Sequence, residues 1–203
     1  MFSSRIDWKL IFGILFAAVL MIVSFHYKSS FWYMYGAAML FLISFGIFNV
    51  DLQKKNSFFK GLIPAIFGAV ILYLVFYIGA FILKIMPFGL DHSVQSAFHR
   101  FATDDWYVWL LMIIAIVPGE EIFWRGFVLQ RLLNAFQTWF AILAATLILT
   151  VIVAFSGSFA LTIGMFFATL FWNFMYVWRP SLLMTYLSHL SFVFLLLAAL
   201  PIY

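Results

Sequence analysis

Long apolar runs separated by short polar breaks repeat along the whole chain. A helix needs about 20 apolar residues to cross the hydrocarbon layer of a membrane. The runs predict helices over residues 8–26, 31–49, 61–86, 105–118, 120–135, 138–155, 159–178 and 181–200. The fourth and fifth of these form one crossing, which we expect to be broken at Pro118-Gly119, because proline removes a backbone donor and glycine admits unusual conformations. The pattern therefore predicts an all-α polytopic membrane bundle of about seven crossings.

Polar residues at the breaks indicate where helices begin and end. Thr103-Asp104-Asp105 is typical of a capped helix start, Ser156-Gly157-Ser158 of a tight turn, and Ser181 of an N-cap after Arg179-Pro180. The longest connection, residues 87–104, predicts a short amphipathic segment that lies on the membrane. No repeat or linker divides the chain, so we expect one integral membrane domain over residues 1–203.

Composition excludes a soluble domain. Of the 203 residues, 67% are hydrophobic and only 9% are charged, and the mean hydropathy is +1.13. A soluble surface needs far more charge, so the lipid bilayer is the expected environment. The net charge of +4 requires no nucleic-acid partner, because Lys and Arg gather at the cytoplasmic ends of membrane helices. Cysteine is absent, which excludes disulfides and thiolate metal sites.

The distribution of positive charge predicts the orientation. With the N-terminus in the cytoplasm, eight of the 11 Lys and Arg residues lie on the inner side. These are Arg5, Lys9, Lys54, Lys55, Lys60, Arg125, Arg131 and Arg179. We therefore expect a multi-pass protein of the plasma membrane with a cytoplasmic N-terminus.

Two adjacent carboxylates and an arginine interrupt an otherwise unbroken apolar stretch near the middle of the chain. Glu120 and Glu121 are the only glutamates, and Arg125 lies four residues after the second. A charge at membrane depth costs at least ~2.5–3.5 kcal/mol on insertion scales, so these residues are candidates for a functional site. Glu121 and Arg125 have the favoured spacing for an ion pair on a helix. Glu120 has no such partner on its own helix, which favours a role as a general base acting on water.

Two alternatives bear on this site. Both carboxylates could pair with Arg125 and serve only to hold helices together. His189 is the only histidine well inside a predicted helix, and we expect it to be the partner of Glu120 rather than a hydrogen-bonded core residue. Asn173 is a further intramembrane polar residue, more typical of a helix–helix hydrogen bond than of a catalyst.

The residues do not favour a metal site. There is no His-Glu-x-x-His motif, and His92 and His99 in the long connection are more typical of solvated histidines than of a metal pair. Adjacent carboxylates on a helix diverge, so Glu120 and Glu121 cannot easily clamp one ion. We expect neither a metal nor another cofactor.

The segment from Pro118-Gly119 through Glu120-Glu121-x-x-x-Arg125, and the segment Trp178 to His189, resemble two motifs of the CPBP family. That family of membrane proteins includes the type II CAAX prenyl endopeptidases, bacteriocin-processing or immunity proteins and lysostaphin-resistance-like proteins. The resemblance covers about residues 105–200. It implies metal-independent hydrolysis of a peptide bond in a membrane protein or peptide.

The resemblance also implies roles for these side chains. Glu120 would be the base, Glu121 and Arg125 its support, and His189 part of the group that polarises the scissile carbonyl. Two further family positions depart from the pattern. The middle motif, Phe-x-x-x-His, aligns Val153 with its histidine, and Val193 stands where the last motif has Asn or Asp.

Three functions therefore stay open. The first is an intramembrane endopeptidase of the CPBP type. The second is a non-catalytic relative that acts as a membrane scaffold, immunity protein or regulatory partner. Loss of one oxyanion donor commonly lowers the rate of an enzyme by ~10²–10³. The absence of the middle-motif histidine at Val153 should lower the rate at least as much. The third, a small transporter or channel, would use the buried acids as an ion path, but the chain lacks inverted repeats and a second interrupted helix.

Overall fold

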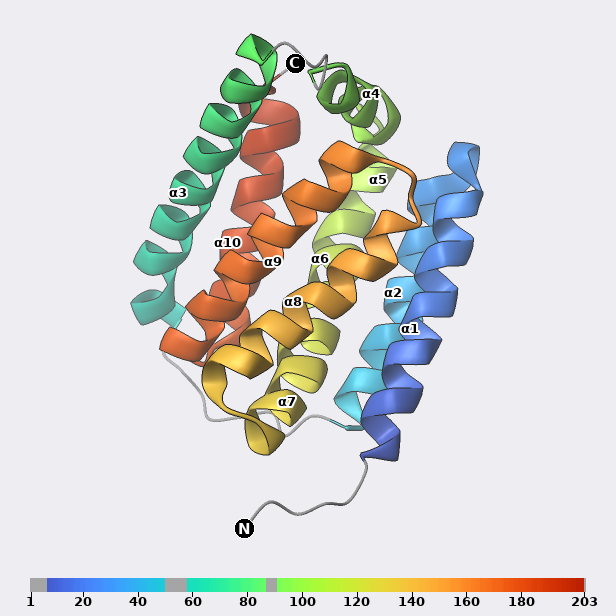
Figure 1. Ribbon diagram of the computed structural model, residues 1–203, viewed down its shortest axis with the longest axis vertical. Coiled ribbons are helices and arrows are strands. Elements are labelled where there is room, and N and C mark those ends of the chain that lie inside the picture. Colours follow the sequence, from blue (N-terminus) through green and yellow to red (C-terminus); the bar gives the residue numbers. More distant parts are fainter. Residues whose placement is uncertain (1–6, 50–57, 87–90, 203) are drawn as a thin grey trace.

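The computed structural model describes residues 7–49, 58–86 and 91–202, and all regular structure within these ranges is helical (Figure 1). The α-helices that cross or flank the bundle are α1 (Trp8–His26), α2 (Phe31–Ile47), α3 (Phe58–Ile85), α4 (Asp91–Phe101), α5 (Trp106–Leu111), α6 (Val117–Glu120), α7 (Gln130–Ala135), α8 (Thr138–Ala154), α9 (Phe159–Trp178) and α10 (Leu182–Phe194). One short 3₁₀ turn, η1 (Lys28–Ser30), and three π-helical segments, η2 (Met112–Ile116), η3 (Glu121–Leu129) and η4 (Leu195–Ala199), connect or extend them.

The predicted membrane bundle is confirmed. Six helical segments of the described chain are long and apolar enough to cross a membrane, and α8, with 17 residues, is a shorter apolar helix. Seventeen residues is the lower end of the spanning range, so the length of α8 is compatible with the seventh crossing that the sequence predicts. Figure 1 shows α1 and α3 running close to the long axis, α8 and α9 inclined to it side by side, and α4 at the upper end. Arg5, Lys54 and Lys55, which contribute to the expected orientation, lie outside the described residues.

The expected break at Pro118-Gly119 was wrong. The crossing continues as helix from Trp106 to Ala135, and only the type of helix changes along it. A π-helical turn precedes the proline, in which the backbone N–H of Val117 donates to the carbonyl of Met112. Such a turn is wider than an α-helical one, so it accommodates the proline ring. Beyond the ring the N–H of Glu121 donates back to the carbonyls of Val117 and Pro118, and helical hydrogen bonding resumes.

The predicted helix starts are confirmed by their capping contacts. The side chain of Asp105 accepts from the N–H of Tyr107, that of Ser158 from Leu161, and that of Ser181 from Met184. Gly157 adopts a φ of 72° in the turn between α8 and α9. That region of φ suits glycine, so the tight turn predicted at this position is explained by its sequence.

Helix α4 forms the predicted amphipathic segment, although residues 87–90 before it lie outside the described chain. Arg100 on α4 donates to the carbonyls of Phe25 at 2.9 Å and Ser156 at 2.8 Å. The hydroxyl of Ser93 accepts from the N–H of Ala160 at 3.1 Å. These bonds tie α4 to the ends of α1, α8 and α9, so it covers one end of the bundle.

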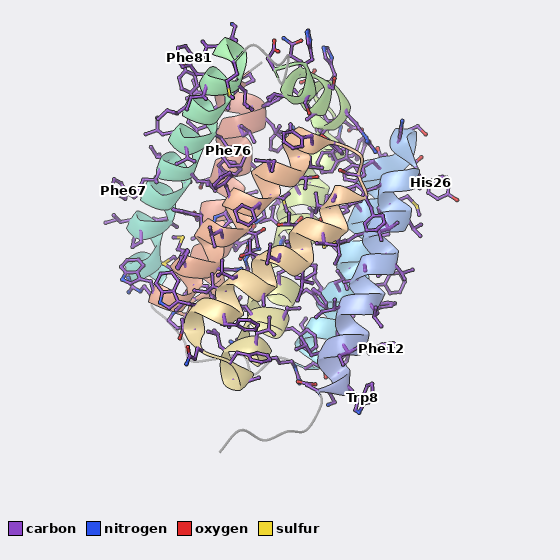
Figure 2. The ribbon with its side chains drawn as sticks, in the orientation of Figure 1. Trp8, Phe12, His26, Phe67, Phe76 and Phe81 are labelled. Atoms are coloured by element: carbon purple, nitrogen blue, oxygen red, sulfur yellow. The ribbon has the colours of Figure 1, made fainter. Side chains whose placement is uncertain are left out.

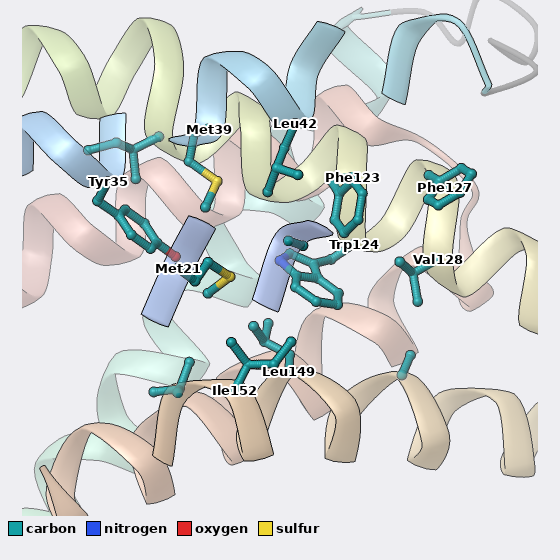
Figure 3. Packing of buried hydrophobic residues seen from close by; sticks show 14 of the residues in the cluster. Met21, Tyr35, Met39, Leu42, Phe123, Trp124, Phe127, Val128, Leu149 and Ile152 are labelled. Carbon is teal, nitrogen blue, oxygen red and sulfur yellow. The ribbon is translucent and has the colours of Figure 1, made fainter. Parts of the chain in front are cut away.

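Two apolar clusters form the interior. The larger one joins α1, α2, the π-helical segments and α8, and Figure 3 shows Trp124 and Leu42 packed within it. The smaller one joins α3, α9 and α10. In Figure 2, Phe67 and Phe81 project outward from α3, whereas Phe76 points inward, where its ring lies 4.9 Å from that of Phe192. Helix α3 therefore packs chiefly through one face and leaves the other to lipid.

Candidate active site

The predicted ion pair lies at the centre of the bundle. On η3, Arg125 Nη1 lies 3.2 Å from Glu121 Oε1, and each side chain is only 1% exposed. The spacing of four residues brings the two groups together on one helix, as the sequence indicated. The pair neutralises two charges that would otherwise be stranded in an apolar interior.

His189 on α10 reaches both carboxylates. Its Nδ1 lies 2.8 Å from Glu121 Oε1, and its Nε2 lies 3.9 Å from Glu120 Oε2. Because an ionised carboxylate only accepts hydrogen bonds, Nδ1 carries the proton in the first contact. The sequence predicted a partnership with Glu120, but the closer contact is with Glu121. Nε2 is therefore the ring nitrogen that faces Glu120.

Tyr35 completes the surroundings of Glu120. Its hydroxyl donates to Glu120 Oε1 at 2.8 Å, and the tyrosine is only 5% exposed. Figure 3 shows Tyr35 reaching from α2 into the interior beside Met39. This residue was not predicted from the sequence, because nothing in the pattern of α2 separates Tyr35 from the aromatic residues that anchor helices at a membrane interface.

Trp172 on α9 fixes the ring of His189. The two rings stack with centroids 3.8 Å apart and an interplanar angle of 28°. The indole N–H donates to Ser188 Oγ at 3.3 Å. The Arg125 guanidinium lies 5.3 Å from the centroid of the same indole. One tryptophan therefore contacts both the histidine and the arginine of the cluster, and sequence analysis did not identify it either.

Asn173 acts as the sequence predicted. Its Nδ2 donates to Thr146 Oγ1 at 3.1 Å, which joins α9 to α8. Thr146 in turn donates to the carbonyl of Ile142. This is an interhelical hydrogen bond of the kind that holds membrane helices together.

Glu120 and His189 are among the residues that line an apolar cavity of about 830 Å³. Its walls come from the part of α3 between Val75 and Met86, the part of α9 between Phe159 and Trp172, and residues of α2, α4 and α10. Among its lining residues, the only hydroxyl, carboxyl or imidazole groups belong to Tyr35, Glu120 and His189. The polar groups are thus gathered at one place in a hydrophobic chamber, a common design for a ligand site.

The two positions that depart from the family pattern also face this chamber. Val153 on α8 and Val193 on α10 both line the cavity that contains Glu120 and His189. The alignment suggested by the sequence therefore places both positions at the candidate site. Both side chains are apolar, so neither position contributes a polar group to the cavity.

The described side chains offer little to a metal ion. Within residues 7–49, 58–86 and 91–202, no three His, Asp or Glu side chains are grouped closely enough to hold one. Glu121 is already engaged by Arg125 and His189. The chemistry available at the site is therefore that of a carboxylate, an imidazole and a phenol.

Residues 102–195 match a family model described as type II CAAX prenyl endopeptidase Rce1-like. The matched segment contains the helices from α5 to α10, and with them Glu120, Glu121, Arg125 and His189. Tyr35 lies outside it. No curated protein and no solved structure matches the chain.

Proposed function

We propose that this chain, a member of the CPBP family that includes the type II CAAX prenyl endopeptidases, hydrolyses a peptide bond in a membrane-associated protein or peptide. The observation that carries the proposal is the pairing of Glu120 and His189 where an apolar cavity begins. The distance of 3.9 Å between Oε2 and Nε2 leaves room for a water molecule within hydrogen-bond reach, about 2.8 Å, of both atoms.

Glu120 is the proposed general base. It takes a proton from water as the oxygen attacks the carbonyl carbon of the peptide, and a tetrahedral intermediate forms. The same carboxyl then returns the proton to the leaving nitrogen, and the C–N bond breaks to give a carboxylic acid and an amine.

Glu121 and Arg125 are the proposed support of this chemistry. The Glu121 carboxylate accepts the Nδ1 proton of His189, which orients the ring with Nε2 toward Glu120 and the cavity. A protonated Nε2 would donate a hydrogen bond to the carbonyl oxygen as negative charge develops on it. Trp172, stacked on the ring, keeps the imidazole in this plane.

We propose a plasma-membrane location with a cytoplasmic N-terminus. In this orientation α4 and the outer half of α3 lie on the side away from the cytoplasm. The cavity is lined by both elements. A substrate would then be an apolar segment that reaches the site from the outer half of the bilayer, and it would be a protein or peptide rather than a nucleic acid.

A second candidate function is a non-catalytic membrane partner. The presence of Val153 and Val193 in the cavity favours it, because both side chains are apolar at positions where the family pattern has polar groups. Such a protein would bind an apolar segment in the chamber without cleaving it. The carboxylate site would then be dispensable.

Complementation of a deletion strain tests the proposed function. Wild type, Glu120→Gln and His189→Ala are produced at equal abundance in the membrane, and the phenotype of the deletion is scored. Loss of function in both folded variants supports hydrolysis. Full function in both would contradict it and favour the binding role.

A further inference from the structure

We propose that Tyr35 is a positioning residue for Glu120: its hydroxyl holds one carboxylate oxygen so that the other faces His189 and the cavity. The proposal rests on the proposed function in one respect, that Glu120 is the reacting group. It adds a residue from α2 to a site whose other members all lie within the matched segment 102–195. Tyr35 acts through Glu120 and is not itself assigned a contact with substrate.

The contact is short, buried and specific in its atoms. Tyr35 donates to Oε1 of Glu120 at 2.8 Å, and the nearest atom of His189 faces the other oxygen, Oε2. A carboxylate side chain with neither oxygen held could rotate about its terminal torsion, which is broad. With Oε1 held, that rotation is restricted and Oε2 keeps its direction.

The phenol ring of Tyr35 is itself packed among aromatic side chains. The Tyr35 ring stacks on Phe31, with centroids 5.2 Å apart, and lies 6.1 Å from the ring of Phe25. Both phenylalanines are buried. The hydroxyl therefore enters the site from a packed aromatic cluster, and its position does not depend on the carboxylate alone.

The close approach of α2 to α6 has a local cause. A Cβ atom built on Gly119 would lie 2.7 Å from Met39 Cβ and 3.0 Å from the Met39 carbonyl oxygen. The absence of a side chain at Gly119, immediately before Glu120, thus lets the two backbones come together. Met39 lies one helical turn after Tyr35, so the same approach brings the phenol to the carboxylate.

A helix-packing role alone would not require this atom pair. Tyr186 on α10 shows the alternative, because its hydroxyl donates to the backbone carbonyl of Ile113 at 3.1 Å and does not line the cavity. Tyr35 instead donates to a carboxylate oxygen, so removal of its hydroxyl frees that oxygen and should change how fast the Glu120 carboxyl group reacts. That change can be measured without any substrate.

A hydrophobic carbodiimide provides the probe, because it reacts with the protonated form of a carboxyl group. The purified protein in lipid vesicles is treated over a range of pH, and mass spectrometry measures the rate of adduct formation on Glu120 separately from Glu121. The titratable and charged side chains near Glu120 on the packed helices are Tyr35 on α2, Glu121 and Arg125 on η3, and His189 on α10.

Tyr35→Phe should raise the rate of adduct formation on Glu120 severalfold, because the carboxyl group loses the hydrogen bond that holds Oε1. Tyr186→Phe, the matched control, should leave this rate unchanged. Glu120→Gln should remove the adduct at position 120. If Tyr35→Phe changes the rate no more than Tyr186→Phe does, the proposal is overturned.

A second variant keeps the test decisive if Tyr35→Phe does not accumulate. Incorporation of 3-fluorotyrosine at position 35 retains the ring and makes the hydroxyl a stronger donor, so the rate of adduct formation on Glu120 should fall. An unchanged rate contradicts the proposal. Failure of the proposed function is a separate result: the difference in labelling would persist, but Glu120→Gln would still complement the deletion strain.

Discussion

Arg125 Nη1 lies 3.2 Å from Glu121 Oε1 in a setting where both side chains are 1% exposed. Such a pair contributes little net stability compared with two apolar residues, because both charges must leave water. The pair instead determines the position of the His189 ring. Glu121 also accepts from His189, so the pair fixes the ring that faces the proposed base.

Arg125→Gln should lower the free energy of unfolding by about 3–5 kcal/mol, because it leaves the Glu121 charge buried without its partner. Unfolding in mixed detergent micelles measures the change. Arg131→Gln is the control: Arg131 pairs with Asp7, but the two side chains are 25% and 38% exposed, and exposed pairs contribute only about 0–1 kcal/mol. Equal losses in the two variants would contradict the assignment of Arg125.

Gly119→Ala should destabilise the protein by about 1–3 kcal/mol, as expected for an added methyl group in a packed interior. The new Cβ would lie 2.7 Å from Met39 Cβ and would push α2 away from α6. The Tyr35–Glu120 hydrogen bond should weaken with it. Gly79→Ala is the control, because a Cβ at Gly79 meets no atom within 4 Å. Thermal unfolding and Glu120 labelling of the two variants should therefore differ.

Val153→His should raise the proposed hydrolysis, because it places an imidazole in the cavity that Glu120 and His189 also line. A positioned acid or base contributes typically about 10²–10⁴-fold, and a gain at the lower end is expected. The rate of product formation in membranes measures the gain. Ile152→His is the control, since Ile152 is buried on the same helix but does not line the cavity. An equal effect of both substitutions would contradict the alignment of Val153 with the histidine of the middle family motif.

Asp7 lies at the N-terminus of α1, and its carboxyl group should make the free energy of unfolding depend on pH. Partial burial opposes its ionisation, but the Arg131 hydrogen bond and the Leu10 backbone N–H outweigh it and lower the pKa of this carboxyl. The resulting stability is present above the unfolded pKa, near 3.8. It is lost as the pH falls through the lower folded value. Melting temperatures of wild type and Asp7→Asn should differ at about pH 6 and converge below about pH 3; a constant difference would contradict the linkage.

Local relations were predictable from the sequence. Each crossing is a continuous apolar run, so its extent follows from hydropathy. The Glu121–Arg125 pair follows from a spacing of four on one helix, and the Ser158 and Ser181 caps follow from their residue types. His189 could be identified because an imidazole in the middle of an apolar run is costly without a partner.

Relations that depend on packing were not predictable. Tyr35 and Glu120 are 85 residues apart, and their contact exists because α2 approaches α6 at Gly119. Pro118 indicated a broken helix, but its effect was absorbed by a change in hydrogen-bond register that no residue pattern specifies. The same holds for the preference of His189 for Glu121, which depends on how α10 packs against η3.

The most direct test of glutamate-dependent hydrolysis is a comparison of protein termini in membranes from cells that contain wild type or Glu120→Gln at equal abundance. Quantitative mass spectrometry identifies new N- and C-termini whichever membrane protein is the substrate. Glutamate-dependent hydrolysis predicts a set of termini that is present with wild type and missing with Glu120→Gln, each new carboxyl group carrying one oxygen atom from labelled water. Identical termini in the two membranes would contradict it.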